Sequence, residues 1–108
     1  MKKLTVFEET VMLAIYRLKE NAYSVTIHQK IFDMTGKDII VGTLFNTLKQ
    51  MYRKGYINKK RGRPIHTKGS KSIIFYTISK EGFLALEQTR DMHKQIWKQI
   101  PAVLNKDS

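Results

Sequence analysis

The stretch that decides the fold is residues 41–59, VGTLFNTLKQMYRKGYINK. Its apolar residues recur at i, i+4 and i+7, the spacing of one buried helix face. These residues are Leu44, Leu48 and Met51. The pattern predicts a helix over residues 41–54, and Gly55 is expected to end it, because glycine takes a left-handed backbone conformation without steric cost. Residues 56–59 then predict a short strand.

Two further helices are predicted before this stretch. Thr5 and Glu8 have the spacing of a capping box, which indicates a helix over residues 6–19. Its inner face carries Phe7, Val11, Met12, Ala14, Ile15 and Leu18. A second helix is expected from Ser24, as the N-cap, to Gly36. Its apolar face is expected to hold Val25, Ile27, Ile31 and Met34.

The chain after this stretch predicts a second strand and a long helix. Residues 73–78, IIFYTI, are rich in β-branched and aromatic types and indicate a strand. A loop of about twelve residues, rich in Lys and Arg, would join the two strands. Ser79 is expected to cap a helix that runs to about Ile100, and residues spaced alternately three and four apart form a heptad seam along it. The seam is Leu86, Thr89, His93, Ile96, Ile100 and Val103. It predicts packing against a second copy, against the helix at 6–19, or against both, with a loose, wet centre at the two polar positions.

The positive charge is concentrated in one block. From Ile39 to Lys80 there is no acidic residue, and this block carries +10 of the formal net charge of +11. Such a concentration repels itself unless a polyanion meets it, and a DNA duplex is the natural partner, since each neutralised phosphate releases a counterion. The alternative is the solvated surface of a generally basic protein.

The order of elements predicts the fold class. Helix, helix, helix, strand, basic loop, strand and long helix indicate an α+β, mostly α protein. The expected fold is a winged helix-turn-helix, three helices plus a two-stranded wing, with a long C-terminal dimerisation helix. Residues 1–79 would be the winged-helix DNA-binding domain, and residues 80–108 the dimerisation helix packed on it.

Composition and motifs argue against several other classes. Without cysteine there is no disulfide and no cysteine-ligated metal site, which suits a cytoplasmic protein. No run approaches the length of a transmembrane helix, so no membrane partner is expected. The three histidines are far apart and no catalytic motif is present, so we expect no enzyme activity, cofactor or metal.

Several segments together resemble the PadR family of prokaryotic transcriptional regulators. VGTLFNTL at 41–48, followed by KGYI at 54–57, is similar to that family's Gly-Thr-Leu-Tyr and later Lys-Gly-Leu-Val. Supporting matches are Phe7-Glu8, Ala22-Tyr23 and FYTISKEG at 75–82. The chain departs from the family at Phe45, where Tyr is usual, and at residues 68–71, KGSK in place of Gly-Gly-Arg-Arg. The resemblance implies a dimeric DNA-binding regulator.

The outward face of the helix at 41–54 holds the expected recognition residues. They are Thr43, Asn46, Thr47, Lys49, Gln50 and Arg53. Asn and Gln can pair bidentately with adenine, and Lys with guanine. The expected wing contacts are Lys60, Arg61, Arg63, Lys68 and Lys71. Arg61-Gly62-Arg63-Pro64 resembles the core of an AT-hook, which inserts arginines into a narrow minor groove. Tyr23 could donate to a phosphate, and Phe45 is expected to be a partly buried structural wedge.

The resemblance also implies a homodimer formed by the first and last helices, and in some members a small aromatic effector bound there. The expected interface residues are Phe7, Val11, Leu86, His93, Ile96, Trp97 and Ile100. Met92 and Trp97 are the expected ligand residues. The function predicted is a sequence-specific regulator, most simply a repressor on an inverted-repeat operator. The alternative is a protein that coats nucleic acid without sequence preference.

Overall fold

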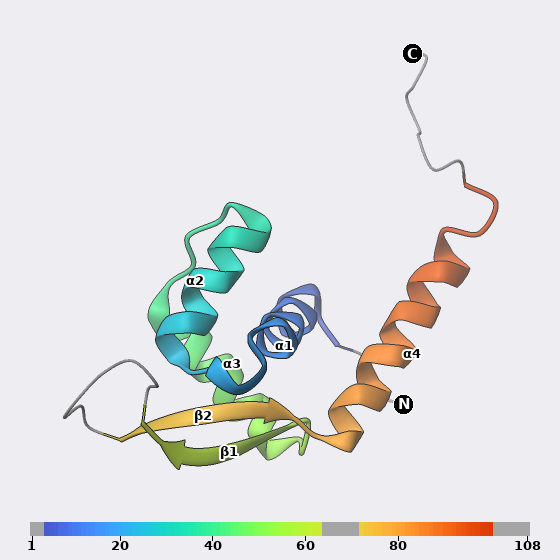
Figure 1. The fold of residues 1–108 in the computed structure, drawn as a ribbon. Coiled ribbons are helices and arrows are strands. Elements are labelled where there is room, and N and C mark those ends of the chain that lie inside the picture. The colour runs from blue at the N-terminus through green and yellow to red at the C-terminus, as the bar shows by residue number, and fades with distance from the viewer. Residues whose placement is uncertain (1–3, 64–71, 101–108) are drawn as a thin grey trace.

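A computed structural model describes residues 4–63 and 72–100 of the chain (Figure 1). Its elements are α1 (Val6–Leu18), the short 3-10 helix η1 (Lys19–Asn21), α2 (Ser24–Thr35), α3 (Val41–Arg53), β1 (Ile57–Gly62), β2 (Ile73–Ile78) and α4 (Lys80–Ile96). The first three long helices pack together, and the antiparallel β1–β2 hairpin runs along one side of them. The predicted order, the mostly α class and the winged helix are confirmed.

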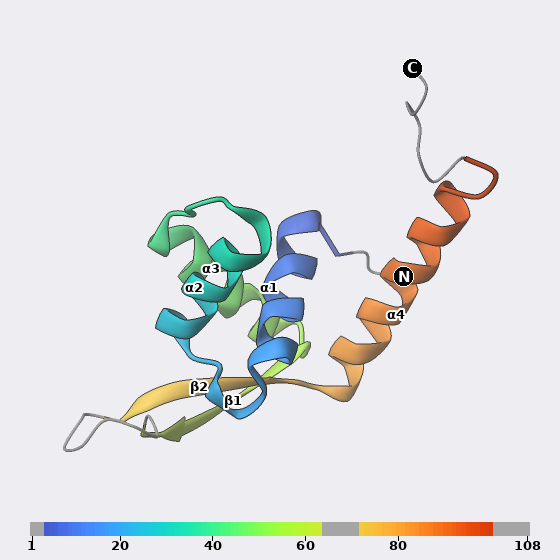
Figure 2. The ribbon, with the colours of Figure 1, turned by 45° about the horizontal axis from the view of Figure 1, so that its top comes forward.

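The two ends of the hairpin lead in opposite directions (Figures 1 and 2). One end points away from the helices toward the wing tip, and the other continues into α4, which projects beyond the three-helix body. In the register, Ile57 pairs with Ile78 and Lys59 with Tyr76. The N–H of Tyr76 also donates to the carbonyl of Ala22 at 2.8 Å, which ties β2 to the segment before α2.

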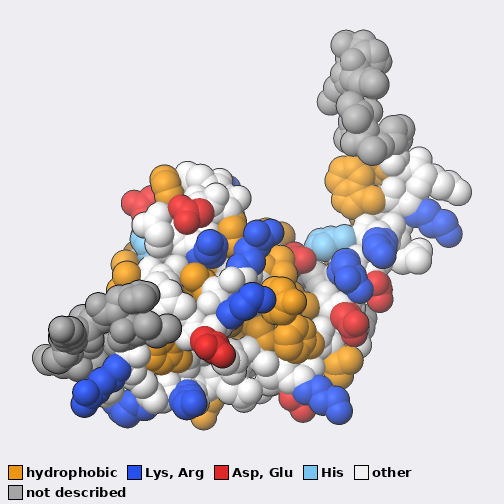
Figure 3. Space-filling model, viewed as in Figure 1, with side chains coloured by type: hydrophobic (Ala, Val, Ile, Leu, Met, Phe, Trp, Pro, Cys, Tyr) orange, Lys and Arg blue, Asp and Glu red, His pale blue; other side chains and the backbone are white. Residues whose placement is uncertain are grey.

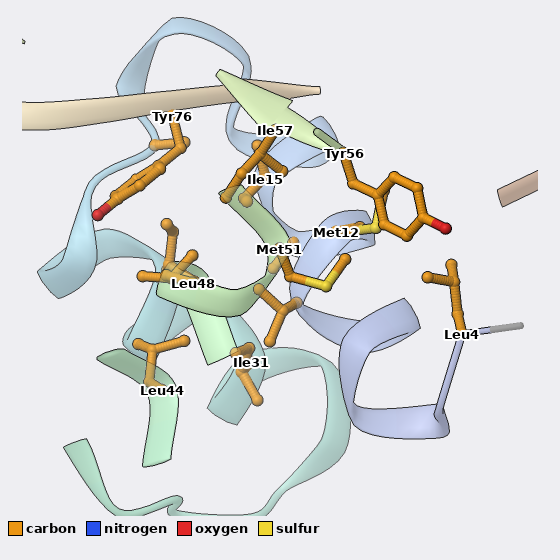
Figure 4. Close-up of a cluster of buried hydrophobic side chains, with 14 of the residues drawn as sticks. Leu4, Met12, Ile15, Ile31, Leu44, Leu48, Met51, Tyr56, Ile57 and Tyr76 are labelled. Atoms are coloured by element: carbon orange, nitrogen blue, oxygen red, sulfur yellow. The ribbon is translucent and has the colours of Figure 1, made fainter. Parts of the chain in front are cut away.

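The core lies between the three helices and the inner face of the hairpin (Figure 4). Its fully buried side chains are Val11, Met12, Ile15, Ile27, Ile31, Leu44, Leu48, Met51 and Ile57. The three apolar positions predicted for α3 are all among them, so the predicted inner face of this helix is confirmed. That face determines which side chains of α3 remain outside.

The predicted capping box is present at the start of α1 and also holds α3. The N–H of Glu8 donates to Thr5 Oγ1 at 3.0 Å, and Thr5 N–H donates to Glu8 Oε1 at 2.9 Å. The other Glu8 oxygen accepts from Lys54 Nζ at 2.9 Å. Burial raises the pKa of Glu8, but the hydrogen bonds from Thr5 and Lys54 outweigh it and hold the pKa below its ordinary value. The charged carboxylate therefore joins the start of α1 to the end of α3.

The start of α4 is fastened to the turn between α3 and β1. Ser79 Oγ donates to the carbonyl of Gly55 at 2.5 Å and accepts from the N–H of Gly82 at 3.0 Å. The Ser79 N–H donates to the carbonyl of Tyr56 at 3.0 Å. Gly55 has a φ of 82°, so the predicted glycine end of α3 is confirmed. These bonds give α3, the hairpin and α4 one common anchor.

Some local expectations were wrong. The N-cap of α2 is Tyr23 rather than Ser24, because Thr26 Oγ1 accepts from the Tyr23 N–H at 3.0 Å and so fixes the first turn one residue earlier. Val25 is 67% exposed and not part of the inner face. Strand β1 extends to Gly62, since its backbone pairs with β2 along its whole length, so part of the predicted loop is strand.

The predicted seam of the last helix also needs correction. Helix α4 ends at Ile96, four residues before the expected end at Ile100. Pro101 disfavours a helical residue before it, and the chain leaves the helix one turn earlier. Thr89 is only 3% exposed, with its hydroxyl bonded to the Ala85 carbonyl at 2.8 Å, so it belongs to the chain's own core and not to a wet seam. Val103 lies outside the described residues.

The close approach of α4 to the turn predicts that Gly82→Ala is strongly destabilising. A Cβ at Gly82 would lie 2.1 Å from the backbone oxygen of Tyr56, which cannot rotate away. We expect a loss of at least about 2 kcal/mol in the free energy of unfolding. Gly42→Ala is the matched control: nothing lies within 4 Å of a Cβ there, and alanine should be neutral or stabilising by up to about 1 kcal/mol. Chemical denaturation of both variants is the measurement, and equal stabilities would contradict the anchoring role of Gly82.

Candidate nucleic-acid interface

The buried face of α3 divides the rest of this helix into three lines of side chains. Residues that are three, four or seven positions apart lie on one line along a helix. The outward line is Asn46, Gln50 and Arg53, and all three side chains are exposed. Lys49 is also exposed, beside this line. The structure therefore brings four of the six predicted recognition residues to one outer face.

The other two predicted residues lie on an edge that turns toward α1. Thr43 and Thr47 share a line with Lys54, and Lys54 reaches Glu8 of α1. Thr43 is exposed, whereas Thr47 is half-buried. They are thus separated from the wing by the width of α3.

The opposite edge of α3 faces the start of α2 and the wing. It carries Val41, Phe45 and Tyr52, all of them about half exposed. Val41 lines a hollow of about 230 Å³ together with residues from the first turns of α2. At the other end, Lys59 Nζ of β1 lies 4.2 Å from the centre of the Tyr52 ring, a cation–π contact. Phe45, which we expected to be a partly buried structural wedge, is 50% exposed.

The wing presents its basic side chains on two faces. Ile57 is buried against the core, and side chains two apart in a strand share a face, so Lys59 and Arg61 are turned toward α3. Lys60 is on the other face. Arg61 Nη1 donates to Ser72 Oγ at 3.3 Å, at the end of the paired strands that lies away from Ile57 and Ile78.

Our sequence reasoning missed Lys59 and Tyr52 as parts of this surface. The period of two counted from Ile57 could have shown that Lys59, and not Lys60, faces α3. Arg63 is exposed at the end of the described strand. Lys68 and Lys71, which complete the predicted wing contacts, and Pro64 of the AT-hook-like segment lie outside the described residues.

Two residues near the start of α2 have structural roles. The Tyr23 ring packs edge-to-face on Phe75 of β2, with centroids 5.5 Å apart, which holds the start of α2 against the wing. His28 Nε2 lies 2.7 Å from the carbonyl of Ile39 and 3.7 Å from the carboxylate of Asp38. This contact fixes the loop that leads into α3.

A second surface lies between α1 and α4. Its hollow of about 420 Å³ is lined by Glu9, Leu13, Tyr16, Phe83, Leu86, Glu87 and Arg90. Tyr16 and Phe83 meet edge-to-face at 5.8 Å, and hydrophobic side chains gather over α1 in the space-filling view (Figure 3). Three apolar side chains at the far end of α4 are exposed: Ile96, Trp97 and Ile100.

The structure changes the set of predicted interface residues. Val11 was a wrong choice, because it is fully buried within the chain and has no surface to offer a partner. Phe7 and Leu86 are half-buried, and His93 Nε2 contacts Glu9 of its own chain at 3.3 Å. Sequence reasoning missed the exposed apolar residues of the hollow, which lie outside the heptad seam: Leu13, Tyr16 and Phe83.

The predicted ligand residues do not meet within one chain. Met92 is half-buried and Trp97 is exposed. Five residues apart, they lie about 140° from each other around the axis of α4. Within residues 4–63 and 72–100, no three side chains of His, Asp or Glu gather closely enough to hold a metal ion. The helices in the described part of the chain are all too short or too polar to span a membrane.

Comparison with known proteins finds likeness in structure. No protein-family model and no curated protein matches the chain. A PadR-like transcription factor from Bacteroides fragilis superposes with a TM-score of 0.72 and 19% identity, covering 87% of this chain and 85% of that one. A PadR-like transcriptional regulator from Bacillus cereus gives 0.71 and 16%, covering 88% and 87%. The fold is that of PadR-like regulators. RosR of H. salinarum also shares it, with a TM-score of 0.68 and 19% identity, covering 93% and 83%.

Two of the segments that carried the resemblance, KGYI at 54–57 and FYTISKEG at 75–82, meet in the structure. Gly55 and Tyr56 form the turn after α3, and Ser79 and Gly82 are the residues that bond to it or touch it. The two motifs are thus the two sides of one contact. Their residue types follow from backbone conformation and close approach rather than from binding.

The two faces of β1 predict unequal contributions to DNA binding. Lys59→Ala should reduce the slope of log K against log salt by about one, the effect of losing one phosphate contact. The reason is that the Lys59 side chain lies on the face of β1 that is turned toward α3. Lys60→Ala is the matched control on the other face of the strand, and its slope should stay close to that of the unmodified protein. Binding of a labelled duplex over a salt series measures both slopes. A larger effect for Lys60 than for Lys59 would refute the assignment of faces.

Proposed function

We propose that the chain is a sequence-specific DNA-binding transcriptional regulator of the PadR family, acting in the cytoplasm as a homodimeric repressor. The observation that carries the proposal is one acid-free surface shared by α3 and β1. It combines amide side chains at Asn46 and Gln50 with the cations Lys49, Arg53 and Lys59. Cations supply affinity for phosphates, and amides suit base edges in the major groove.

Each element would contact a different part of the duplex. Helix α3 would enter the major groove with Asn46 and Gln50 toward the bases. The basic wing would contact the backbone or minor groove, with Arg61 and Arg63 nearest the tip. In this arrangement residues 1–79 form the DNA-binding domain and residues 80–108 the dimerisation segment. The solved proteins of this fold are named as transcription factors, which supports a regulator rather than an enzyme.

A second candidate is a protein that coats nucleic acid through charge alone. The concentration of +10 in the block from Ile39 to Lys80 favours this candidate as much as the first. The amide side chains on the outer face of α3 favour the regulator, because a purely electrostatic binder needs none there. The two candidates differ in whether binding depends on sequence.

The experiment is selection of duplexes from a random pool, followed by fluorescence anisotropy of the selected and a shuffled duplex across a salt series. We predict that Asn46→Ala and Gln50→Ala each weaken binding to the selected duplex by about 1–3 kcal/mol and leave the shuffled duplex unchanged. Gln88→Ala, an exposed amide on α4, is the matched control. Equal losses on both duplexes, or no enriched sequence, would favour the charge-only coat.

The homodimer is proposed to form through the hollow between α1 and α4 and the apolar end of α4. A contiguous apolar surface of this kind is rarely left open on a monomer. An aromatic effector is proposed to bind against Trp97 in the dimer. Because Met92 lies on another side of the helix, the partner's copy would have to complete such a site. Trp97 is the only tryptophan in the sequence, so its fluorescence reports on this region.

The proposed interface predicts that Leu13→Glu separates the protomers. Leu13 lines the hollow and is 37% exposed, so a charge there can be tolerated by the fold but not inside an interface. We expect the dimer dissociation constant to rise at least tenfold in sedimentation experiments. Leu84→Glu is the control, because Leu84 is exposed on α4 but does not line the hollow. A monomeric unmodified protein, or equal effects of both changes, would exclude this interface.

A further inference from the structure

The wing-side edge of α3 carries apolar side chains that the fold does not use. Val41 is 52% exposed and Phe45 is 50% exposed, one helical turn apart on the same line. Val25 of α2 lines the same hollow as Val41 and is 67% exposed. We call Val25, Val41 and Phe45 the apolar edge.

The surroundings of the apolar edge are those of a surface that meets a polyanion. Lys59 lies against Tyr52 at one end of the same line, and Lys49 and Arg53 follow along the helix. Helix α3 and strand β1 contain no acidic residue. The carboxylate of Asp38, in the loop before α3, is 3.7 Å from His28. The partner of this edge therefore combines negative charge with exposed apolar groups.

The major groove of DNA offers this combination in one chemical group. Each thymine presents its C5-methyl there, and side chains such as Phe or the methyl of Thr pack on it. RNA fits less well, because uracil lacks the methyl and the major groove of an A-form helix is too narrow for a side chain to read. Cytosine presents an amino donor that a carboxylate would accept, and α3 has no carboxylate.

We propose that Val41 and Phe45, supported by Val25, read the 5-methyl groups of thymine in the major groove. The inference rests on the proposed function and adds specificity-determining residues to it. Val41 is in the first turn of α3, the part of a recognition helix that reaches base edges. Phe45 follows one turn later, next to Asn46, which can pair with adenine. Neighbouring thymine and adenine contacts would make the half-site rich in A·T pairs.

The test replaces thymine by deoxyuridine, one position at a time, in the selected duplex bound by the full chain. This exchange removes only the methyl group and leaves base pairing intact. We expect two or three positions in each half-site at which binding weakens about fourfold, the effect of losing one buried methyl contact. Val41→Ala should bind the thymine duplex more weakly and no longer distinguish thymine from deoxyuridine at one of them. Val6→Ala, at a valine that is 74% exposed at the start of α1, should keep the full difference.

The outcomes separate this inference from the proposed function. If a sequence is enriched but deoxyuridine changes nothing at any position, the thymine reading is wrong and the regulator stands. If deoxyuridine weakens binding equally for the unmodified protein and for Val41→Ala and Phe45→Ala, the methyl groups act through DNA shape and the apolar edge does not read them. If no sequence is enriched, both proposals fail.

Discussion

The turn at Gly55-Tyr56 is the constraint on which the rest of the structure depends. The carbonyl oxygens of these two residues accept the hydroxyl and the backbone N–H of Ser79, and Gly82 lies against the second of them. Helix α3 ends there, β1 begins there and α4 starts on top of it. A shift of this turn would move α3, the wing and α4 together. The relative positions of these three elements are therefore set by short hydrogen bonds and one close backbone approach.

A second constraint at the same end of α3 comes from Glu8. The carboxylate that caps α1 also accepts from Lys54, just after the last turn of α3. A buried carboxylate is costly unless all of its oxygens are bonded, and here both have partners. Glu8 and Ser79 hold opposite sides of one junction. These contacts fix the orientation of α3 relative to α1 and α4, and so determine which of its side chains face outward.

Much of this arrangement could be predicted from local pattern. The period of Leu44, Leu48 and Met51 gave the inner face of α3, and the glycine after the helix gave its end. Strand β1 was predicted too short, because Lys60-Arg61-Gly62 has little intrinsic preference for a strand. Its backbone pairs with β2 regardless, and that ladder is a property of two segments together. Val11 shows the same limit: periodicity marks an apolar position but does not tell whether its own core or a partner covers it.

The candidate site shows where sequence patterns stop. The pattern of α3 separates buried from exposed positions, but the edge beside the wing is decided by how the hairpin packs. Both Thr43 and Phe45 flank the buried face, and only the contacts of Val41 with α2 and of Tyr52 with Lys59 show which edge lies beside the wing. From the sequence alone, an exposed valine or phenylalanine also cannot be distinguished from a core residue.

The apolar edge has a cost for the protein in water. Apolar side chains that remain half exposed beside a basic surface favour association with other molecules. Positive charge attracts any duplex equally, so it supplies affinity without sequence specificity. Amide side chains distinguish between bases, but their hydrogen-bonding groups are left without partners when the base is wrong. An apolar side chain differs from a cation and from an amide, because its contact with a methyl group adds to the binding free energy and its only loss without the methyl is that it stays in water. If α3 enters the major groove as proposed, its outward face offers only two amides, and apolar contacts are the simplest way to extend the sequence that this helix can distinguish.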